Sequence, residues 1–414
     1  METFLEIQAE SGFGLNNIPF GVFRLSSEDD QNARCCTRIG DYIVDLSILE
    51  SENKFGISNV RIFDKPHLND FMSKGKDQWN IVRKTIQQLF SKGSELEQNS
   101  ELLKKILYKL HDCVLLLPCK VGDYTDFYSS KNHAFNLGCM FRGKDNALQP
   151  NWVWLPVGYH GRASSIVVSP ASFKRPSGQL KNPNETEPYF GKSKKMDFEL
   201  EMVTVVGTSN KLGEPIDVKN ANDHIFGYLL MNDVSCRDIQ GWEYVPLGPF
   251  TAKNCITVVS PWIVTKEALE PFRVELPKQD PVPLDYLKDP NYSSYDIDLN
   301  VYIKTQSSDK QDLISISNMK HLYWSPAQQV AHHTVTGCNL QTGDMLGSGT
   351  ISGLDQNKES GSFIELSWNG KQPLQLPNGE TRTFWEDGDT IVMTGKAKKN
   401  ETVISFGECT AMMQ

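Results

Sequence analysis

No C-x-x-C pair is present among the nine cysteines of this 414-residue chain. Apart from the adjacent Cys35 and Cys36 the cysteines are scattered, and their number is odd. This pattern predicts reduced thiols in the cytosol rather than a disulfide framework, and it disfavours a zinc site built from thiolates. A G-x-S-x-G motif is also missing, which disfavours a conventional serine hydrolase.

Long apolar runs are missing as well, so the sequence predicts no transmembrane helix. The start, Met1-Glu-Thr-Phe-Leu-Glu, lacks the basic residues and apolar core of a secretory signal, and the end, Ala-Met-Met-Gln414, is not a peroxisomal Ser-Lys-Leu tail. The net charge of −9 disfavours nucleic acid or an anionic membrane as a partner. We therefore expect a cytosolic protein that acts on a small molecule.

The length suggests two or three domains and allows a large core without disulfides. Short β-type runs occupy the beginning of the chain, and apolar residues at a helical period follow. We place a domain boundary near 117–123, and the lack of a Gly/Ser linker there predicts that the two parts pack together. Expected strands in the front part are 20–25 and 42–46, and expected helices begin at 66 and span 77–90 and 102–111.

From residue 150 onwards the chain is rich in β-type runs, glycine and proline. The predicted class is mainly β with some α, with a smaller mixed domain in front. Expected strands are 152–156, 165–168, 198–206, 226–234, 255–260, 297–303 and 390–394, and expected helices are 234–244 and 325–334.

The polar stretch 123–142 holds an acid, two tyrosines, a histidine and an arginine. If 124–128 is extended, Asp126 and Tyr128 point to the same face, because side chains repeat every two residues. His133 follows within one turn, and Arg142 ends the stretch. These groups suit a site for a small anionic substrate; the alternative is a polar surface loop with one structural histidine.

A second cluster is the pair Glu199 and Glu201, which share one face of the expected strand 198–206. Both faces of this strand are apolar further along, which predicts burial on both sides. Two buried carboxylates side by side repel each other and are poorly solvated, and a hard divalent cation relieves both problems. The alternative is that the strand end carrying the pair is exposed.

A third cluster begins at Asp233, which ends a strongly apolar run. If a helix follows, Arg237, Gln240 and Tyr244 lie on one of its faces. The alternative for Asp233 is that it caps that helix. A loop fixed by proline and glycine then brings Lys253 towards the same region.

Glycines at 343, 347, 349 and 353 allow the backbone to approach a ligand closely, and Thr350 is the polar group among them. Close behind, Glu365 falls in the apolar run 363–368, where we expect a strand. A lone acid in such surroundings requires a cationic or imidazole partner.

Taken together, four carboxylates without thiolates favour calcium (Ca²⁺) or magnesium (Mg²⁺) over zinc. His133 is the natural general base, because an ordinary imidazole pKa of about 6.5 suits proton abstraction near neutral pH. Glu365 can fix the tautomer of that histidine. The groups available to face an oxyanion are Arg237, Gln240 and Lys253.

The segments 123–142, 197–206, 231–253 and 343–353, with Ser260-Pro-Trp262, resemble the fumarylacetoacetase (fumarylacetoacetate hydrolase) family over nearly the whole chain. The resemblance implies a small SH3-like barrel domain with helices at 1–118, a β-rich fumarylacetoacetase-type catalytic domain at 119–414, and a homodimer. It also implies hydrolysis of 4-fumarylacetoacetate to fumarate and acetoacetate, the last step of tyrosine and phenylalanine catabolism.

Carried over position by position, the resemblance implies a role for each residue of the four clusters. It places calcium on Asp126, Glu199, Glu201 and Asp233, magnesium near Lys253 and Thr257, the water-activating base on His133 and its orienting acid on Glu365. It places substrate contacts on Tyr128, Arg142, Tyr159, Gln240, Tyr244 and Thr350.

Two other functions compete with this reading. One is a related hydrolase or decarboxylase that acts on acylpyruvates or oxaloacetate. The other is a non-catalytic calcium-binding protein, against which the presence of both His133 and Glu365 argues, since a structural cation needs no base.

Overall fold

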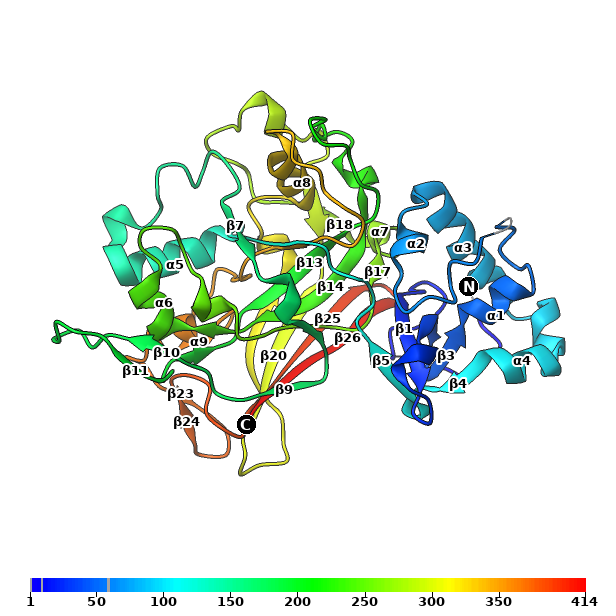
Figure 1. Ribbon diagram of the computed structural model, residues 1–414, viewed down its shortest axis with the longest axis horizontal. Coiled ribbons are helices and arrows are strands. Elements are labelled where there is room, and N and C mark those ends of the chain that lie inside the picture. Colours follow the sequence, from blue (N-terminus) through cyan, green and yellow to red (C-terminus); the bar gives the residue numbers. More distant parts are fainter. Residues whose placement is uncertain (1, 9, 58–59) are drawn as a thin grey trace.

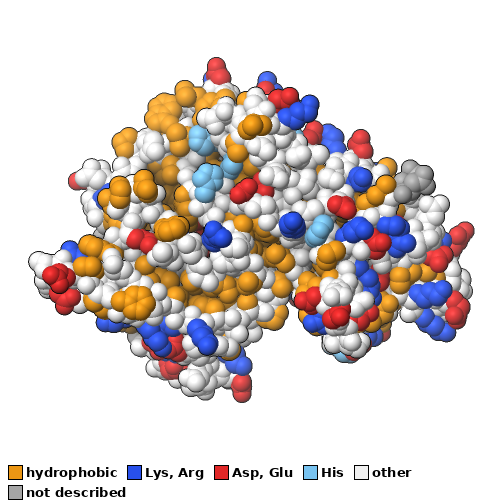
Figure 2. Space-filling model, in the orientation of Figure 1, with side chains coloured by type: hydrophobic (Ala, Val, Ile, Leu, Met, Phe, Trp, Pro, Cys, Tyr) orange, Lys and Arg blue, Asp and Glu red, His pale blue; other side chains and the backbone are white. Residues whose placement is uncertain are grey.

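The computed structural model describes residues 2–8, 10–57 and 60–414. Figure 1 shows a smaller N-terminal part, blue and cyan, beside a larger part that runs from green to red. The described residues form no helix long and apolar enough to cross a membrane. On the face shown in Figure 2, acidic and basic side chains are interspersed over the smaller part.

The front part is built on a five-stranded antiparallel sheet in the order β4-β3-β2-β1-β5. The predicted strands at 20–25 and 42–46 and the predicted helix at 77–90 are confirmed. The strands are β1 (Phe20–Leu25), β2 (Arg34–Ile39), β3 (Tyr42–Asp45), β4 (Leu107–Lys109) and β5 (Cys113–Leu116), and the helices are α1 (Leu46–Ser51), α2 (Asn69–Met72), α3 (Lys76–Leu89) and α4 (Ser100–Ile106).

The helix expected at 102–111 is wrong in its second half. Helix α4 ends at Ile106, and the next residues become strand β4 because they pair with the edge of β3. The hydrogen bonds available at the open edge of the sheet therefore outweigh the helical periodicity of these residues.

The larger part contains an eight-stranded mixed sheet in the order β7-β6-β22-β13-β14-β16-β8, with β17 pairing β14. Most neighbours are antiparallel, but β22 runs parallel to β6 and β16 runs parallel to β8. The strands are β6 (Tyr124–Phe127), β7 (Gly158–Gly161), β8 (Ile166–Val168), β13 (Leu200–Val206), β14 (Ile225–Asp233), β16 (Thr257–Val259), β17 (Val264–Thr265) and β22 (Met345–Gly347).

A second sheet in the order β21-β20-β25-β26-β9 packs against this sheet. Leu230 of β14 lies in one core cluster with Leu299, Val301 and Phe406 of the second sheet. In Figure 1 its long red strands β25 and β26 run beside the green strands β13 and β14. Its strands are β9 (Ala171–Phe173), β20 (Asp298–Lys304), β21 (Asp312–Asn318), β25 (Thr390–Lys399) and β26 (Thr402–Met413).

The opposite face of β13 packs against the front part. Val203 and Val205 belong to one core cluster with Phe20 and Phe71, whereas Met202 belongs to the cluster shared with the second sheet. The prediction that this strand is buried on both sides is therefore confirmed, because every residue of β13 is buried.

Short elements complete the larger part and carry much of its polar chemistry. The helices are α5 (Lys131–Arg142), α6 (Arg237–Glu243), α7 (Lys266–Leu269), α8 (Pro326–Thr334) and α9 (Phe363–Leu366), and the two-stranded pairs are β10 (Ser177–Leu180) with β11 (Tyr189–Lys192), β12 (Met196–Asp197) with β15 (Ser235–Cys236), β18 (Arg273–Glu275) with β19 (Ser293–Tyr295), and β23 (Leu374–Gln375) with β24 (Thr381–Arg382).

Two predicted strands of the larger part are wrong. Residues 152–156 form a turn and the bend that follows it, and residues 363–366 form the one-turn helix α9. In the second case the buried carboxylate of Asp197 accepts hydrogen bonds from the amides of Phe363 (2.6 Å) and Ile364 (3.1 Å), which fixes a helical start that the apolar run does not reveal. The helix at 325–334 is confirmed, with a capping box at Ser325.

Helix α5 packs so closely on the following turn that Gly138 has no room for a side chain. A Cβ at that position would lie 1.8 Å from the carbonyl oxygen of Ala147. We expect Gly138→Ala to lower the free energy of unfolding by about 1–3 kcal/mol or more, because the backbone must shift to relieve the overlap. Chemical denaturation measures this change.

The matched control is Gly241→Ala in helix α6, where a Cβ meets nothing within 4 Å. We expect this change to be neutral or slightly stabilising, since alanine favours a helix over glycine. Equal stabilities of the two variants would show that the close approach of α5 to Ala147 does not constrain the fold.

Candidate active site

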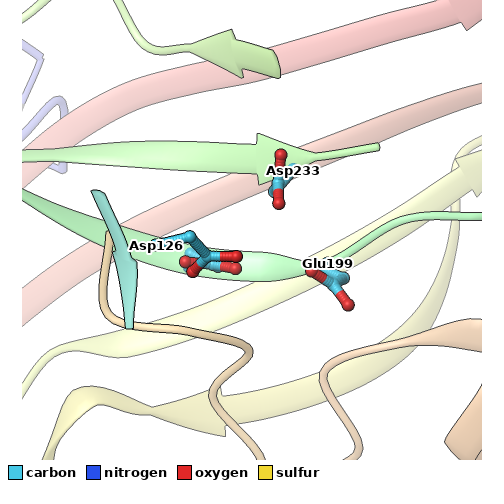
Figure 3. Close-up of side chains that lie close together, drawn as sticks. Asp126, Glu199 and Asp233 are labelled. Carbon is cyan, nitrogen blue, oxygen red and sulfur yellow. The ribbon is translucent and has the colours of Figure 1, made fainter. Parts of the chain in front are cut away.

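Four carboxylates from three segments of the large sheet meet at one point. Asp126 lies in β6, Glu199 comes directly before β13, Glu201 lies in β13, and Asp233 ends β14. One oxygen of each lies within 4.8 Å of the others, and all four residues are buried. Figure 3 shows Asp126, Glu199 and Asp233 close together on three different segments. The structure thus brings together the four acids that the sequence singled out.

Strand register explains this meeting. The amide of Asp233 donates to the carbonyl of Glu199, so these two residues lie opposite each other on antiparallel strands. Glu201 lies two residues further along and therefore points to the same face as Glu199. Glu199 is 4% exposed and Glu201 is 0% exposed, so the alternative of an exposed strand end is wrong.

Burial in a cluster of like charges strongly shifts the pKa values of these acids. Burial raises the pKa of Asp126 and of Glu201 well above the usual range, and the neighbouring carboxylates raise both further. Burial alone would also raise the pKa of Glu199, but the ammonium of Lys253 and the guanidinium of Arg237 bring it down to about 2. Asp126 and Glu201 are thus the two acids whose charge the nearby cations compensate least.

These acids fit a cation. Within the described residues, Asp126 Oδ1 and Glu201 Oε1 are buried without a hydrogen-bond partner. Leaving buried polar atoms unpaired costs about 1–3 kcal/mol each, and more for charged groups. An all-oxygen donor set with several carboxylates is what hard divalent cations such as Ca²⁺ and Mg²⁺ prefer. The donor chemistry therefore suits a divalent metal ion.

Lys253 and Thr257 lie on the edge of this cluster next to Asp233. The ammonium of Lys253 bonds Glu199 and donates to Asp233 Oδ2 at 2.6 Å. The hydroxyl of Thr257 donates to Asp233 Oδ1 at 2.7 Å. Asp233 therefore binds these two side chains, and helix α6 has no side-chain cap, so the alternative that Asp233 caps it is wrong.

A histidine–carboxylate pair lies beside the acids. Nδ1 of His133, in the first turn of α5, lies 2.7 Å from Glu365 Oε2. If Nδ1 carries the proton, Nε2 keeps a free lone pair and can act as a base. The ring of Tyr128 meets the imidazole edge to face at 5.4 Å between centroids.

Three further side chains hold Glu365, and the sequence did not single them out. The hydroxyls of Ser352 (2.9 Å) and Ser362 (2.8 Å) donate to Oε2, and the amide of Asn136 (2.9 Å) donates to Oε1. Burial alone would raise the pKa of Glu365, but His133 and the hydrogen bonds from Asn136 and Ser362 lower it, which keeps the carboxylate charged. Ser352 lies within the glycine run 343–353, the one available signal for its role.

Asp197 was also missed, although it shares the period-two face of Glu199 and Glu201. Its Oδ2 accepts from Arg237 Nε at 2.7 Å, and its two oxygens receive the amides that begin α9. The far end of the Arg237 guanidinium donates to Glu199 Oε1 at 2.5 Å. One buried carboxylate therefore positions both the arginine and the helix that carries Glu365.

The remaining residues expected to contact substrate differ in how close they come. The hydroxyl of Tyr159 donates to Asp126 Oδ2 at 2.6 Å, and Gln240 accepts from Arg237 Nη1 at 3.1 Å. Thr350 is buried, and its hydroxyl is unpaired within the described part of the chain. These three residues therefore lie in the acid cluster or next to it.

Two residues are not drawn into the cluster. Arg142 is exposed, and its guanidinium donates to the carbonyls of Asn146 (3.1 Å) and Ala147 (2.6 Å). Tyr244 follows α6 with its side chain 48% exposed. Of the residues predicted to share one face of α6, Arg237 therefore points into the cluster, whereas Tyr244, just after the helix, is exposed to solvent.

Comparison with known proteins identifies the sequence family. The family model described as "Fumarylacetoacetate (FAA) hydrolase C-terminal" matches residues 124–411, and "Fumarylacetoacetase N-terminal" matches residues 16–118. Fumarylacetoacetase from Dictyostelium discoideum is 48% identical, with 99% of this chain and 97% of that protein covered. Fumarylacetoacetase from Homo sapiens is 47% identical, with 98% of this chain and 97% of that protein covered.

Solved structures confirm the fold. A fumarylacetoacetate hydrolase from Exiguobacterium antarcticum matches with a TM-score of 0.52 at 16% identity, covering 96% of this chain and 99% of that chain. A putative HpcE protein from Mycobacterium smegmatis matches with a TM-score of 0.54 at 18% identity, covering 95% of this chain and 98% of that chain.

The role of Asp197 can be tested by removing its carboxylate. We expect Asp197→Ala to lower the free energy of unfolding by about 3–5 kcal/mol, because the substitution leaves the buried Arg237 with one partner fewer. The amides of Phe363 and Ile364 lose their acceptor, so their hydrogen exchange should also accelerate. Asp298→Ala, which removes an exposed carboxylate on β20, is the control. Unchanged protection at 363 and 364 would contradict the capping role.

Proposed function

The chain belongs to the fumarylacetoacetate hydrolase family, and on that premise we propose how its buried site works. It is a hydrolase that cleaves a carbon–carbon bond of fumarylacetoacetate to give fumarate and acetoacetate. The observation that carries this conclusion is identity of 46–48% to fumarylacetoacetases over 98–99% of the chain. The geometry described above accounts for the chemistry.

A divalent cation is held by Asp126, Glu199, Glu201 and Asp233 in this proposal. We assign it as Ca²⁺, with Mg²⁺ near Asp233, Lys253 and Thr257. When bound, the cation polarises the oxygens of the 1,3-diketone and stabilises negative charge that develops on them. The unpaired buried oxygens of Asp126 and Glu201 support this assignment.

His133 acts as the general base in the proposed reaction. Nε2 takes a proton from water, and Glu365 holds the imidazole and stabilises the charge that it gains. The hydroxide then attacks a carbonyl carbon of the substrate, and the carbon–carbon bond breaks. His133 returns its proton to the acetoacetate carbon, which leaves the base neutral for the next turnover.

Cations on one side of the site stabilise the oxyanion formed by this attack. Arg237 and Lys253 each bind Glu199, and Gln240 accepts from Arg237. Their positions are therefore fixed before substrate arrives, which is the condition for effective electrostatic stabilisation.

Substrate binding is proposed for six side chains. Tyr128 and Tyr159 lie beside His133 and Asp126, and Thr350 is buried with a hydroxyl that has no partner among the residues that the structure describes. Arg142 must leave its two backbone carbonyls to reach a carboxylate of the substrate. The full set is Tyr128, Arg142, Tyr159, Gln240, Tyr244 and Thr350.

We further propose a division at residue 118, with an N-terminal domain at 1–118 and a catalytic domain at 119–414. The two family matches, which end at 118 and begin at 124, support this division.

We also propose a cytosolic homodimer in tyrosine and phenylalanine catabolism. A surface for a second subunit is supported by a row of exposed apolar side chains at Val245, Leu247 and Phe250.

The base assignment predicts the effect of His133→Ala. Turnover of fumarylacetoacetate should fall about 10²–10⁴-fold, because the water loses its proton acceptor. Calorimetry should show that the cation still binds, since the imidazole is not one of the four carboxylates. The control is His111→Ala, which removes a histidine side chain that is 81% exposed. Near wild-type turnover in His133→Ala would refute the assignment.

The metal assignment predicts that activity depends on a divalent ion. We expect loss of the diketone absorbance of fumarylacetoacetate to stop after full chelation and to resume when Ca²⁺ or Mg²⁺ is restored. At a ligand concentration of 100 Kd the ion should also stabilise the fold by about 2.7 kcal/mol, measured by thermal unfolding.

Other outcomes of that experiment separate the alternatives. Activity that survives full chelation would contradict the metal mechanism, but it would still support fumarylacetoacetate as the substrate. An ion that binds and stabilises the fold without activity on fumarylacetoacetate, but with activity on an acylpyruvate, would favour a related dicarbonyl hydrolase. Binding without turnover of either substrate would favour a calcium-binding protein.

A further inference from the structure

Tyr124 places an unpaired hydroxyl on the sheet face that carries the acids. Its side chain is 3% exposed, and its hydroxyl oxygen has no hydrogen-bond partner among the residues that the structure describes. A buried tyrosine usually pairs its hydroxyl, because an unpaired buried polar group costs free energy. The proposed reaction does not use this side chain, so the role of its hydroxyl is still unassigned.

Strand register places Tyr124 beside the acid cluster. Tyr124 and Asp126 are two residues apart on β6, so their side chains point to the same face of the sheet. Asp126 pairs with Gly347 of β22, and Gly347 pairs with Val203 of β13. Glu201 lies two residues from Val203 and therefore shares this face. Tyr124 and Glu201 thus approach Gly347 from its two neighbouring strands.

Two glycines make room for this tyrosine. A Cβ on Gly161 would lie 2.3 Å from Cδ1 of the Tyr124 ring, so the ring packs directly over the backbone of β7. A Cβ on Gly347 would lie 3.2 Å from the Tyr124 hydroxyl oxygen, 3.0 Å from Glu201 Oε2 and 2.8 Å from the terminal methyl of Met231. The phenol and the carboxylate therefore border the same small space above Gly347.

The two groups that border this space have complementary chemistry. A phenol is protonated near neutral pH, because its ordinary pKa is about 10, so it donates to a carboxylate or to water. Glu201 Oε2 accepts from the amide of Gly349 at 2.8 Å, whereas Glu201 Oε1 and Asp126 Oδ1 have no partner in the described part of the chain. An unpaired donor thus lies beside two unpaired acceptors, and a water can bridge such groups where they do not bond directly.

We propose that Tyr124 is a further residue of the cation site, and that its hydroxyl donates a hydrogen bond to a water bound to the ion above Gly347. The proposal rests on the cation of the proposed function. Ca²⁺ and Mg²⁺ commonly keep water among their oxygen ligands, and side chains that hold such ligands tune the affinity for the ion. Tyr124 is therefore a positioning residue, since it acts through a ligand of the ion.

The test measures the affinity of the metal-stripped, full-length protein for Ca²⁺ by isothermal titration calorimetry. We expect Tyr124→Phe to raise the Kd about 10–100-fold, because the water loses the donor that holds it. The metal-free variant should unfold at the same temperature as the metal-free wild type or at a higher one, since the hydroxyl that it lacks has no partner within the described residues. A merely structural role would shift the unfolding temperature and leave the Kd unchanged.

Thr265→Val is the matched control. Thr265 is 1% exposed, and its hydroxyl is likewise unpaired as far as the structure describes the chain. It lies on β17 and pairs with Gly227, at the end of β14 opposite to Asp233. Loss of this hydroxyl should leave the Kd for Ca²⁺ unchanged. An equal loss of affinity in Thr265→Val and Tyr124→Phe would overturn the proposal.

Gly347→Ala tests where the water lies. The added methyl would occupy the space between Tyr124 and Glu201, and the three atoms nearest to it belong to side chains that can adjust. We expect the Kd to rise about tenfold or more. Adding Tyr124→Phe to Gly347→Ala should then change the Kd by less than about twofold, because the water that the hydroxyl holds is already displaced. Effects that multiply independently would show that Tyr124 acts elsewhere.

The outcome for the wild type separates this proposal from the proposed function. A wild type that binds neither Ca²⁺ nor Mg²⁺ would overturn the metal assignment, and the role of Tyr124 with it. A wild type that binds Ca²⁺ together with a Tyr124→Phe variant of unchanged Kd would overturn the role of Tyr124 alone and leave the metal assignment in place.

Discussion

Mutual repulsion among four buried carboxylates is the constraint around which the catalytic part is arranged. Asp126, Glu199, Glu201 and Asp233 approach within 4.8 Å inside the protein, where water cannot screen them. Lys253 and Arg237 compensate part of this charge, mainly at Glu199. The least compensated charge, at Asp126 and Glu201, is what makes the donor set of this cluster suited to a divalent cation.

The fold holds these charges together by packing the sheet on both faces. The front part covers Val203 and Val205 of β13, and the second sheet covers Met202 on the opposite face. Glu199 and Glu201 continue the face that the front part covers further along the strand. Packing of the N-terminal part therefore fixes the strand that carries two of the acids, which gives that part a role in the site without a catalytic residue of its own.

Long-range contacts place His133, Arg237 and Lys253 around the acids. His133 and Glu365 come from α5 and α9, two helices that lie far apart in the sequence. Asp197 links α9 to Arg237, so the helix that carries Glu365 and the arginine that compensates charge share one buried carboxylate.

The sequence by itself determined the mainly β class, most strands, the residues of the acid cluster, and the pair His133 and Glu365. Period-two alternation and polar residues at strand ends are local signals, which is why they can be found without a structure. It did not reveal the helix at 363–366, the turn and bend at 152–156, or the roles of Asp197, Ser352 and Ser362. Only the tertiary structure decided these, because each depends on a hydrogen bond or a sheet edge supplied by a distant segment. It also decided that Arg142 and Tyr244 stay outside the cluster, since side-chain exposure follows from packing rather than from spacing.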